Sequence, residues 1–398
     1  MKALEGLRLL ELTHMVSGPY AGLILADLGV EVIKVETPGK GDMTRPLMVE
    51  DPRYNVQDMG PYFMSLNRSK KSITLNLKND RGLGLFYELV KISDIVLNNF
   101  SVGVLERLKI DHARLAALNP GIITCSITGF GETGPEKDLP AYDMVAQAMS
   151  GVMSITGPPG GPPTRAGYPI ADINASMMAV TGILAALHAR SVSGRGQHVD
   201  ISMLDVQISA LNYMAAISLM SGEAPGQLGN QHHYHVPYDV YPCRDGHIIL
   251  AVVTDEFWQN LVRIEELAAL DIPENRVRVD RLKNRDQIGQ SLADIFRTRD
   301  KSYWLEKLRE ARIPCASVND LTEVFQEPQV QARNMIIELD YGQDIRVRLP
   351  GNPVKLSDTH EDSFAPSPVL GQHNREILGG WLGASEGELG DLQKAGVI

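Results

Sequence analysis

The chain has 398 residues, of which 43% are apolar and 22% are charged, and its formal net charge is −11. This balance is typical of a globular protein and excludes a disordered or fibrous chain. The acidic charge disfavours nucleic acid as a partner, so any anion site must be built locally. Cys125, Cys243 and Cys315 are too far apart to predict a disulfide framework or a thiolate zinc site. No basic segment precedes an apolar run, and no stretch has the expected length of a membrane span, so we expect a cytoplasmic protein without a membrane segment.

The first third of the chain alternates strand and helix patterns. Residues 7–12 predict a strand, residues 20–28 a helix that stops at Gly29, and residues 30–35 a second strand. Further strands are predicted at 72–77, 94–96 and 122–127, with helices at 81–92 and 104–110. This alternation predicts a parallel, doubly wound α/β sheet with helices on both faces.

Three segments follow from the pattern of the remaining chain. An apolar helix at 173–191, a strand at 198–203 and a helix at 206–220 end at the turn-rich residues 221–226. Strands at 238–241 and 247–253, with amphipathic helices at 287–297 and 303–311, indicate a smaller mixed α/β domain. We therefore expect a large domain at 1–222, a small domain at 223–325, and a C-terminal segment at 326–398 that returns to the large domain.

A glycine pattern, Gly129-x-Gly131-x-x-Gly134, superficially suggests a dinucleotide site, with Glu36 as the ribose-binding acid. That motif requires its third glycine to open a helix and its acid to follow about 20 residues later. Here Gly134 enters the loop sequence Pro-Glu-Lys-Asp-Leu-Pro, and Glu36 lies far upstream. The order of the residues argues against a nicotinamide cofactor.

A second set of segments extends over the whole chain. In chain order they are Gly18-Pro19, residues 25–36, 41–45, 67–72, Asn99-Phe100, residues 129–135, 142–148, 150–151, 156–157, Asp172, and residues 194–197 and 370–373. Their order and spacing resemble the class III CoA-transferase family, also called the CaiB/BaiF family, which includes formyl-CoA and carnitine CoA-transferases.

The resemblance implies that Asp172 is a nucleophile. Without it, an aspartate before a long apolar helix is more simply interpreted as an N-cap, and the two roles are compatible because a helix N-terminus favours an ionised carboxylate. The implied reaction forms an aspartyl anhydride and then an aspartyl-CoA thioester. Each step exchanges one activated acyl bond for another, so we expect coenzyme A as co-substrate and no permanently bound cofactor.

The resemblance also implies a set of CoA-binding positions on the large domain. They are His14, Met15, Val16, Ser17, Leu75, Lys78, Asn99, Phe100, Val104, Arg107 and Met203. Arg45, Arg68, Lys70 and Lys71 are further candidates for phosphate contact, although a basic turn before a strand is common. For Lys78 and Arg107 a solvated surface charge is an equally good interpretation without the family.

Two departures from the family limit this transfer. Residues 229–235 have histidines where formyl-CoA transferase has a glycine-rich lid, and Pro140 replaces its CoA-binding lysine. His232, His233 and His235 could suggest a metal site, but no acidic partner has ligand spacing, so we expect no metal.

The expected activity is transfer of CoA from an acyl-CoA such as succinyl-CoA to a short carboxylic or dicarboxylic acid. An α-methylacyl-CoA racemase is the nearest alternative, but that branch has a histidine where this chain has Tyr142, a poor base at neutral pH. A non-catalytic CoA-binding protein is the other alternative. Because family members form interlocked dimers, the resemblance also implies a homodimer.

Overall fold

The computed structural model describes residues 2–359 and 363–398. Parallel pairings join six strands in the order β3-β2-β1-β4-β5-β6. The strands are β1 (Arg8–Leu12), β2 (Glu31–Glu36), β3 (Lys71–Thr74), β4 (Ile95–Asn98), β5 (Ile123–Thr128) and β6 (His198–Ser202). This is a doubly wound order, and it confirms the predicted fold class.

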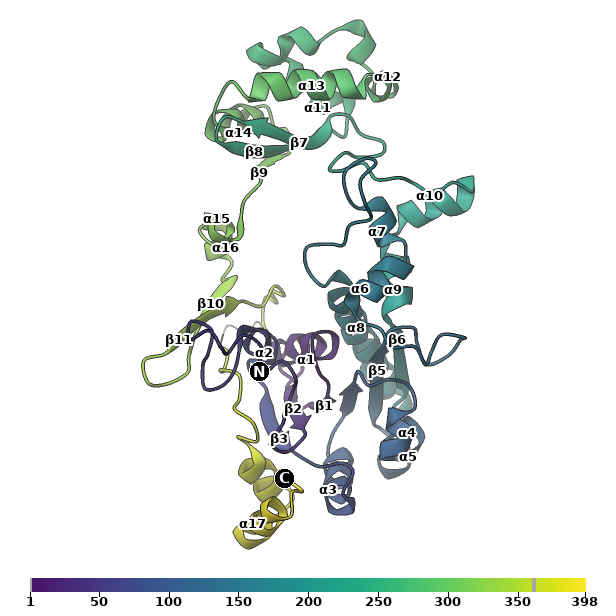
Figure 1. Cartoon of the computed structure of the whole chain (residues 1–398), viewed down its shortest axis with the longest axis vertical. Coiled ribbons are helices and arrows are strands. Elements are labelled where there is room, and N and C mark those ends of the chain that lie inside the picture. Colours follow the sequence, from purple (N-terminus) through teal and green to yellow (C-terminus); the bar gives the residue numbers. More distant parts are fainter. Residues whose placement is uncertain (1, 360–362) are drawn as a thin grey trace. The chain divides into compact units, whose positions relative to one another are not determined.

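Helices cover both faces of this sheet because successive strand residues point to opposite sides. Leu9 faces the layer formed by α1 (Ser17–Asp27) and α8 (Ile170–Ser193). Leu10 faces the layer formed by α3 (Asp80–Lys91), α5 (His112–Leu118) and the C-terminal residues. The C-terminal helix α17 (Glu386–Lys394), yellow in Figure 1, therefore packs on the same core as α3.

Further elements complete the chain. They are α2 (Pro61–Asn67), α4 (Val104–Leu108), α6 (Asp143–Met149), α7 (Val152–Ile155), α9 (Met203–Ala210), α10 (Tyr213–Ser221), α15 (Leu321–Val324), α16 (Pro328–Ala332), the antiparallel pair β10 (Ile336–Asp340) and β11 (Arg346–Pro350), and a π-type helix at Arg375–Trp381.

The chain divides into two compact units. The first comprises residues 1–152, 165–222 and 329–398, and the second comprises residues 153–164 and 223–328. The second unit has an antiparallel sheet, β7 (Tyr238–Cys243), β8 (Gly246–Ala251) and β9 (Cys315–Ser317). Its helices are α11 (Asp255–Val262), α12 (Arg278–Lys283), α13 (Arg285–Phe296) and α14 (Lys301–Glu310), with short 3-10 turns at Glu265–Leu270 and Pro273–Asn275. Trp258, Phe296 and Trp304 fill a separate core there.

Two helices of the first unit differ from the prediction. The helix predicted at 206–220 is two helices, α9 and α10, bent by 81° where Asn212 has a positive φ of 47°. The helix predicted at 173–191 begins earlier, at Ile170. By length and composition alone α8 is apolar enough to cross a membrane, and so is the bent pair, so the expectation that no stretch reaches that length is wrong. One side of α8 packs on the sheet through Ala171, Ala175 and Ala179.

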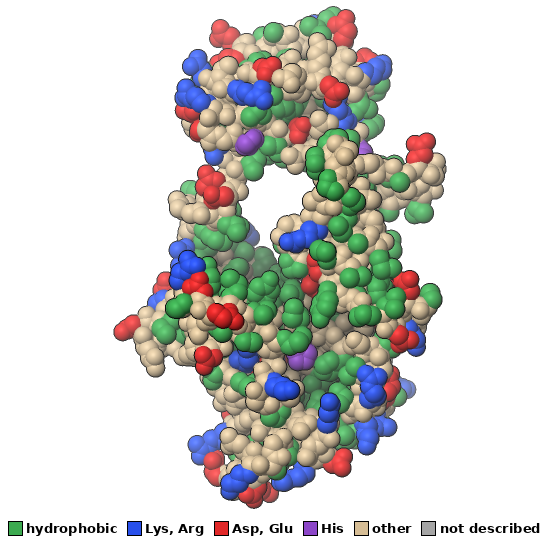
Figure 2. All heavy atoms as spheres, in the orientation of Figure 1, with side chains coloured by type: hydrophobic (Ala, Val, Ile, Leu, Met, Phe, Trp, Pro, Cys, Tyr) green, Lys and Arg blue, Asp and Glu red, His purple; other side chains and the backbone are tan. Residues whose placement is uncertain are grey.

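The other side of α8 is exposed, which differs from the deep burial predicted for it. Met177 and Met178 are 44% and 48% exposed. On α10, Leu219 and Met220 are 87% and 89% exposed. Figure 2 shows apolar side chains gathered in the middle of the visible surface of the first unit, with charged side chains mainly toward its edges.

Candidate active site

A cavity of about 330 Å³ opens at the carboxyl ends of β1 and β4. These strands are neighbours at the centre of the sheet, where the strand order reverses, and ligands of doubly wound folds bind at this switch point. The residues that follow each strand line the cavity: His14, Met15 and Ser17 after β1, and Asn99 and Phe100 after β4. A positive φ of 63° at Met15 makes the turn that leads into α1.

Asp172 lines this cavity from the first turn of α8. Among the described residues that line it, Asp172 is the only carboxylate. Burial, and then the charge of Asp143, raise the pKa of Asp172 to about 7, while a hydrogen bond with Ser17 opposes the rise. The cavity therefore contains one carboxyl group that is partly ionised at neutral pH.

The position of Asp172 differs from the predicted N-cap. The N-cap residue of α8 is Pro169, which supplies no side-chain bond, and Asp172 is the third residue of the helix. The cap comes from Asp143, whose Oδ1 accepts the N–H groups of Ala171 at 2.8 Å and Asp172 at 3.4 Å. The expectation that the helix N-terminus keeps Asp172 ionised is also wrong, because burial and Asp143 shift its pKa upward.

The structure brings some of the predicted CoA-binding residues to the cavity. His14, Met15, Ser17, Asn99, Phe100, Val104 and Met203 line it together with Asp172. Four predicted residues do not. Val16 is buried as the N-cap of α1, Leu75 is 2% exposed in the core below β3, and Lys78 and Arg107 are exposed outside the cavity lining.

Sequence reasoning missed Lys137, which lines the cavity from the loop between β5 and α6. The substitution at Pro140 led us to expect no lysine contact there, yet Pro140 and Lys137 line the same cavity. Lys137 is the only Lys or Arg among the described lining residues. A lysine in the loop sequence Pro-Glu-Lys-Asp-Leu-Pro after a strand was the available signal, and its position three residues before Pro140 obscured it.

The other basic candidates are engaged elsewhere. Lys70 pairs with Glu11 at 2.7 Å, Arg45 with Glu36 at 2.7 Å, and Arg68 with Asp27, all in buried positions. Lys71 bridges Glu31 and Glu376. These side chains stabilise the first unit, so we remove them from the set of candidate phosphate ligands.

A buried charge network supports the turn after β1. Lys34, which is fully buried, contacts Glu11 at 3.0 Å and Asp42 at 2.9 Å, and donates to the carbonyl of Thr13 at 2.9 Å. Lys70 donates to the carbonyl of Pro19 at 2.7 Å. Although burial opposes the charge, Glu11 and Asp42 raise the pKa of Lys34, so it is charged at neutral pH.

His14 lies close enough to this network to interact with its charges. Burial, followed by the charge of Lys34, lowers the pKa of His14, so the ring that borders the cavity is neutral at pH 7. Its ring centroid lies 5.9 Å from that of Phe100. These two rings form an aromatic wall of the cavity.

The histidine-rich loop of the second unit is held by hydrogen bonds. His232 Nδ1 accepts the N–H groups of Tyr234 at 3.0 Å and His235 at 3.3 Å, which occupies one possible ligand atom. Arg285 donates to the His232 carbonyl at 2.9 Å. Within the described ranges, no cluster of three or more His, Cys, Asp or Glu side chains is arranged for a metal ion.

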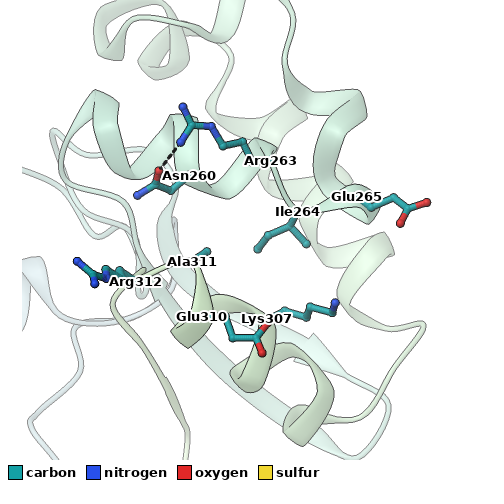
Figure 3. A pocket seen from close by; sticks show the side chains of 8 residues that line it. All are labelled: Asn260, Arg263, Ile264, Glu265, Lys307, Glu310, Ala311 and Arg312. Atoms are coloured by element: carbon teal, nitrogen blue, oxygen red, sulfur yellow. Dashed lines mark hydrogen bonds between the residues drawn. The ribbon is translucent and has the colours of Figure 1, made fainter.

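A larger hollow lies on the second unit and is drawn in Figure 3. Its charged side chains include Arg263, Lys307 and Arg312, and their ends point in different directions. Asn260 bonds to Arg263 at 3.3 Å, and no group of polar atoms converges on one point. The cavity that contains Asp172 is therefore the better candidate for an active site.

Comparison with known proteins decides the family. The model of CoA-transferase family III matches residues 4–374. The chain belongs to this family. It is 36% identical to the succinyl-CoA:mesaconate CoA-transferase of Haloarcula hispanica, over 95% of this chain and 96% of the relative. It is 38% identical to the succinate–glutarate CoA-transferase of Agrobacterium fabrum, over 94% of each.

A solved structure agrees with this assignment. A CaiB/BaiF family protein from Brucella suis superimposes with a TM-score of 0.85 at 33% identity, over 95% of this chain and 99% of that protein. The resemblance predicted from the sequence segments is thereby confirmed. The chain is an acyl-CoA:carboxylate CoA-transferase.

Proposed function

We propose that this family III CoA-transferase uses Asp172 as its nucleophile and moves CoA from an acyl-CoA donor to a short carboxylic or dicarboxylic acid. The observation that carries the proposal is the isolation of Asp172 as the only carboxylate among the described residues of the cavity. With a pKa of about 7, it is a stronger nucleophile than an exposed aspartate and is still substantially ionised at neutral pH.

The reaction follows from what a carboxylate can do beside a thioester. Asp172 attacks the donor carbonyl, giving a mixed anhydride and CoA thiolate. The thiolate attacks the Asp172 carboxyl carbon, the donor acid leaves, and Asp172 carries CoA as a thioester. An acceptor carboxylate then reverses both steps. The cavity contributes proximity, hydrogen-bond donors and a partly enclosed setting that slows hydrolysis of the anhydride.

In this proposal Lys137 and the aromatic wall of His14 and Phe100 contact CoA. In a chain with a net charge of −11, the phosphates of CoA need a local cation, and Lys137 is the one that the cavity lining offers among the described residues. Neutral His14 and Phe100 provide an apolar surface for the pantetheine arm. No permanently bound cofactor is part of this proposal.

The substrates are proposed from the relatives. Similar enzymes are named for activities that pair succinyl-CoA with mesaconate and succinate with glutarate, and acetyl-CoA with oxalate in an enzyme of Acetobacter aceti. We propose succinyl-CoA as a donor and a dicarboxylate as acceptor. Incubation with a panel of acyl-CoA donors and labelled acids, followed by mass spectrometry, tests this. Exchange of an α-proton alone, without CoA transfer, would instead favour a racemase.

We also propose that the protein acts as a cytoplasmic homodimer without nucleic-acid or membrane partners. Several apolar side chains of α8 and α10 are exposed, including Leu219 and Met220. Exposed apolar surface of this kind marks an interaction site, and we propose that a second copy of the chain covers it. Light scattering of the purified chain tests the oligomeric state. A monomer at micromolar concentration would contradict the proposal.

A further inference from the structure

Ser17 occupies a position that CoA binding alone does not explain. Its side chain lines the cavity together with Asp172, and the Ser17 hydroxyl lowers the pKa of the Asp172 carboxyl group, as a hydrogen-bond donor to that group would. Ser17 is only 6% exposed, so a bond from its hydroxyl to Asp172 would be shielded from water. A buried hydrogen bond to a charged oxygen is stronger than one at the surface.

Asn99 restricts the orientation of the Ser17 hydroxyl. Asn99 Oδ1 accepts the N–H of His14 at 2.9 Å, and Asn99 Nδ2 donates to the His14 carbonyl at 2.7 Å. These two bonds define which end of the amide is the donor. The same Nδ2 donates to Ser17 Oγ at 3.4 Å, so Ser17 Oγ is the acceptor in this bond and its own proton is available to a carboxylate oxygen in the cavity that Asp172 also lines.

The backbone of Ser17 is held against α8. Ser176 Oγ lies 2.6 Å from the Ser17 carbonyl and 2.7 Å from the Asp172 carbonyl, which ties the start of α1 to the first turn of α8. The Lys70 bond to Pro19 fixes the other side of the same turn. Ser17 therefore reaches Asp172 from rigid elements, as a preorganised hydrogen-bond donor must.

We propose that the Ser17 hydroxyl is a catalytic hydrogen-bond donor that aims the Asp172 carboxylate into the cavity and stabilises the oxyanion when Asp172 is itself attacked. This inference rests on the proposed nucleophile. It adds a role that is separate from binding CoA, in which Ser17 acts on the reacting carboxyl group.

The covalent step shows where the hydroxyl contributes. CoA thiolate forms a bond to the Asp172 carboxyl carbon of the mixed anhydride, and the carbonyl electron pair moves onto its oxygen. Ser17 donates to this oxyanion and keeps its own proton. When the pair returns, the bond to the donor acyl oxygen breaks and the donor carboxylate leaves with that electron pair. Because the oxyanion is a better acceptor than the anhydride carbonyl, the bond from Ser17 is strongest in the transition state.

The decisive experiment compares Ser17→Ala and Ser17→Thr with the wild-type enzyme, using an acyl-CoA donor and an acceptor acid. For Ser17→Ala we expect kcat to fall about a hundredfold while KM for the acyl-CoA stays within about twofold. The acid limb of the pH profile should move to higher pH, because the Ser17 bond lowers the pKa of Asp172. Ser17→Thr keeps the hydroxyl and should recover at least about a tenth of the wild-type kcat.

Controls separate this role from structure and from the nucleophile. Thr181→Ala removes a hydroxyl from the exposed side of α8, where Thr181 bonds to the Met177 carbonyl, and should leave the pH profile in place. Wild-type kcat and an unshifted acid limb in Ser17→Ala would overturn the inference, as would equal losses in the Ala and Thr variants. If Asp172→Ala is inactive while Ser17→Ala is normal, only the role of Ser17 fails; an active Asp172→Ala overturns the proposed nucleophile itself.

Discussion

Asp143 caps the helix that carries Asp172 and at the same time raises the pKa of Asp172. The Asp143 carboxylate accepts the Asp172 N–H at 3.4 Å and that of Ala171 at 2.8 Å. Its second oxygen accepts Gln147 Nε2 at 2.6 Å, which holds the group in place. The residue that caps the helix thus adds to the effect of burial in raising the pKa of the candidate nucleophile.

Removing the charge of Asp143 should make Asp172 a stronger acid. In Asp143→Asn the repulsion that favours protonated Asp172 is lost, so its pKa falls from about 7. Activity that needs ionised Asp172 should then persist to lower pH. The measurement is kcat/KM against pH, which reports the free enzyme. An acid limb that stays in place would show that Asp143 does not act on the nucleophile.

Neutralising Asp172 should stabilise the fold above neutral pH. The unfolded chain loses this proton near pH 3.8 and the folded chain near 7, so stability falls as pH rises through that window. Each pKa unit of this shift corresponds to ~1.4 kcal/mol, so ionised Asp172 lowers the free energy of unfolding above pH 7 by at most about 4 kcal/mol. We expect Asp172→Asn to raise the melting temperature at pH 8 and to have little effect at pH 4. Equal shifts at both values would contradict this.

Lys137 should contribute to binding of the CoA phosphates. Lys137→Ala is expected to raise KM for acyl-CoA about tenfold with little change in kcat, and to weaken its salt dependence. An acyl-pantetheine substrate, which lacks the nucleotide phosphates, should not distinguish the variant from the wild type. Lys78→Ala is the matched control, because Lys78 does not line the cavity. Equal effects of the two substitutions on KM would show that Lys137 has no specific role in binding the CoA phosphates.

The buried charge network should matter more for stability than a surface pair. Lys34→Met removes the cation that contacts both Glu11 and Asp42. We expect this change to lower the free energy of unfolding by about 3–5 kcal/mol. Arg53→Ala breaks an exposed pair with Asp51 and should cost less than about 1 kcal/mol. Urea denaturation of the two variants measures the difference. Similar midpoints for both would indicate that water compensates the buried charges.

Several strands and helices of the parallel sheet could be predicted from local sequence patterns, because each forms from a short run of neighbouring residues. Short apolar runs separated by amphipathic helices were enough to predict β1, α1 and β2, and the positive φ of 106° at Gly29 agrees with its predicted role as a helix stop. The strand order is set by long-range pairing, yet alternation of strand and helix restricts it to the parallel, doubly wound class.

Other features depend on contacts that no local pattern contains. The start of α8 is capped by Asp143, which lies 28 residues before Ala171, so the sequence around Pro169 gives no N-terminal signal. The break between α9 and α10 falls inside a continuous apolar run and depends on the left-handed backbone of Asn212. The link between Asn99, Ser17 and Asp172 likewise joins three distant parts of the chain.

The most direct measurement of the central claim is the transfer of oxygen to Asp172. An acceptor acid labelled with the heavy oxygen isotope attacks the aspartyl-CoA thioester, and cleavage of the resulting anhydride leaves one labelled oxygen on the enzyme. After a single turnover, mass spectrometry of the peptide that contains Asp172 should show one heavy oxygen in its side chain, and none when the CoA donor is omitted. Full turnover of the labelled acid with an unlabelled Asp172 would contradict the account.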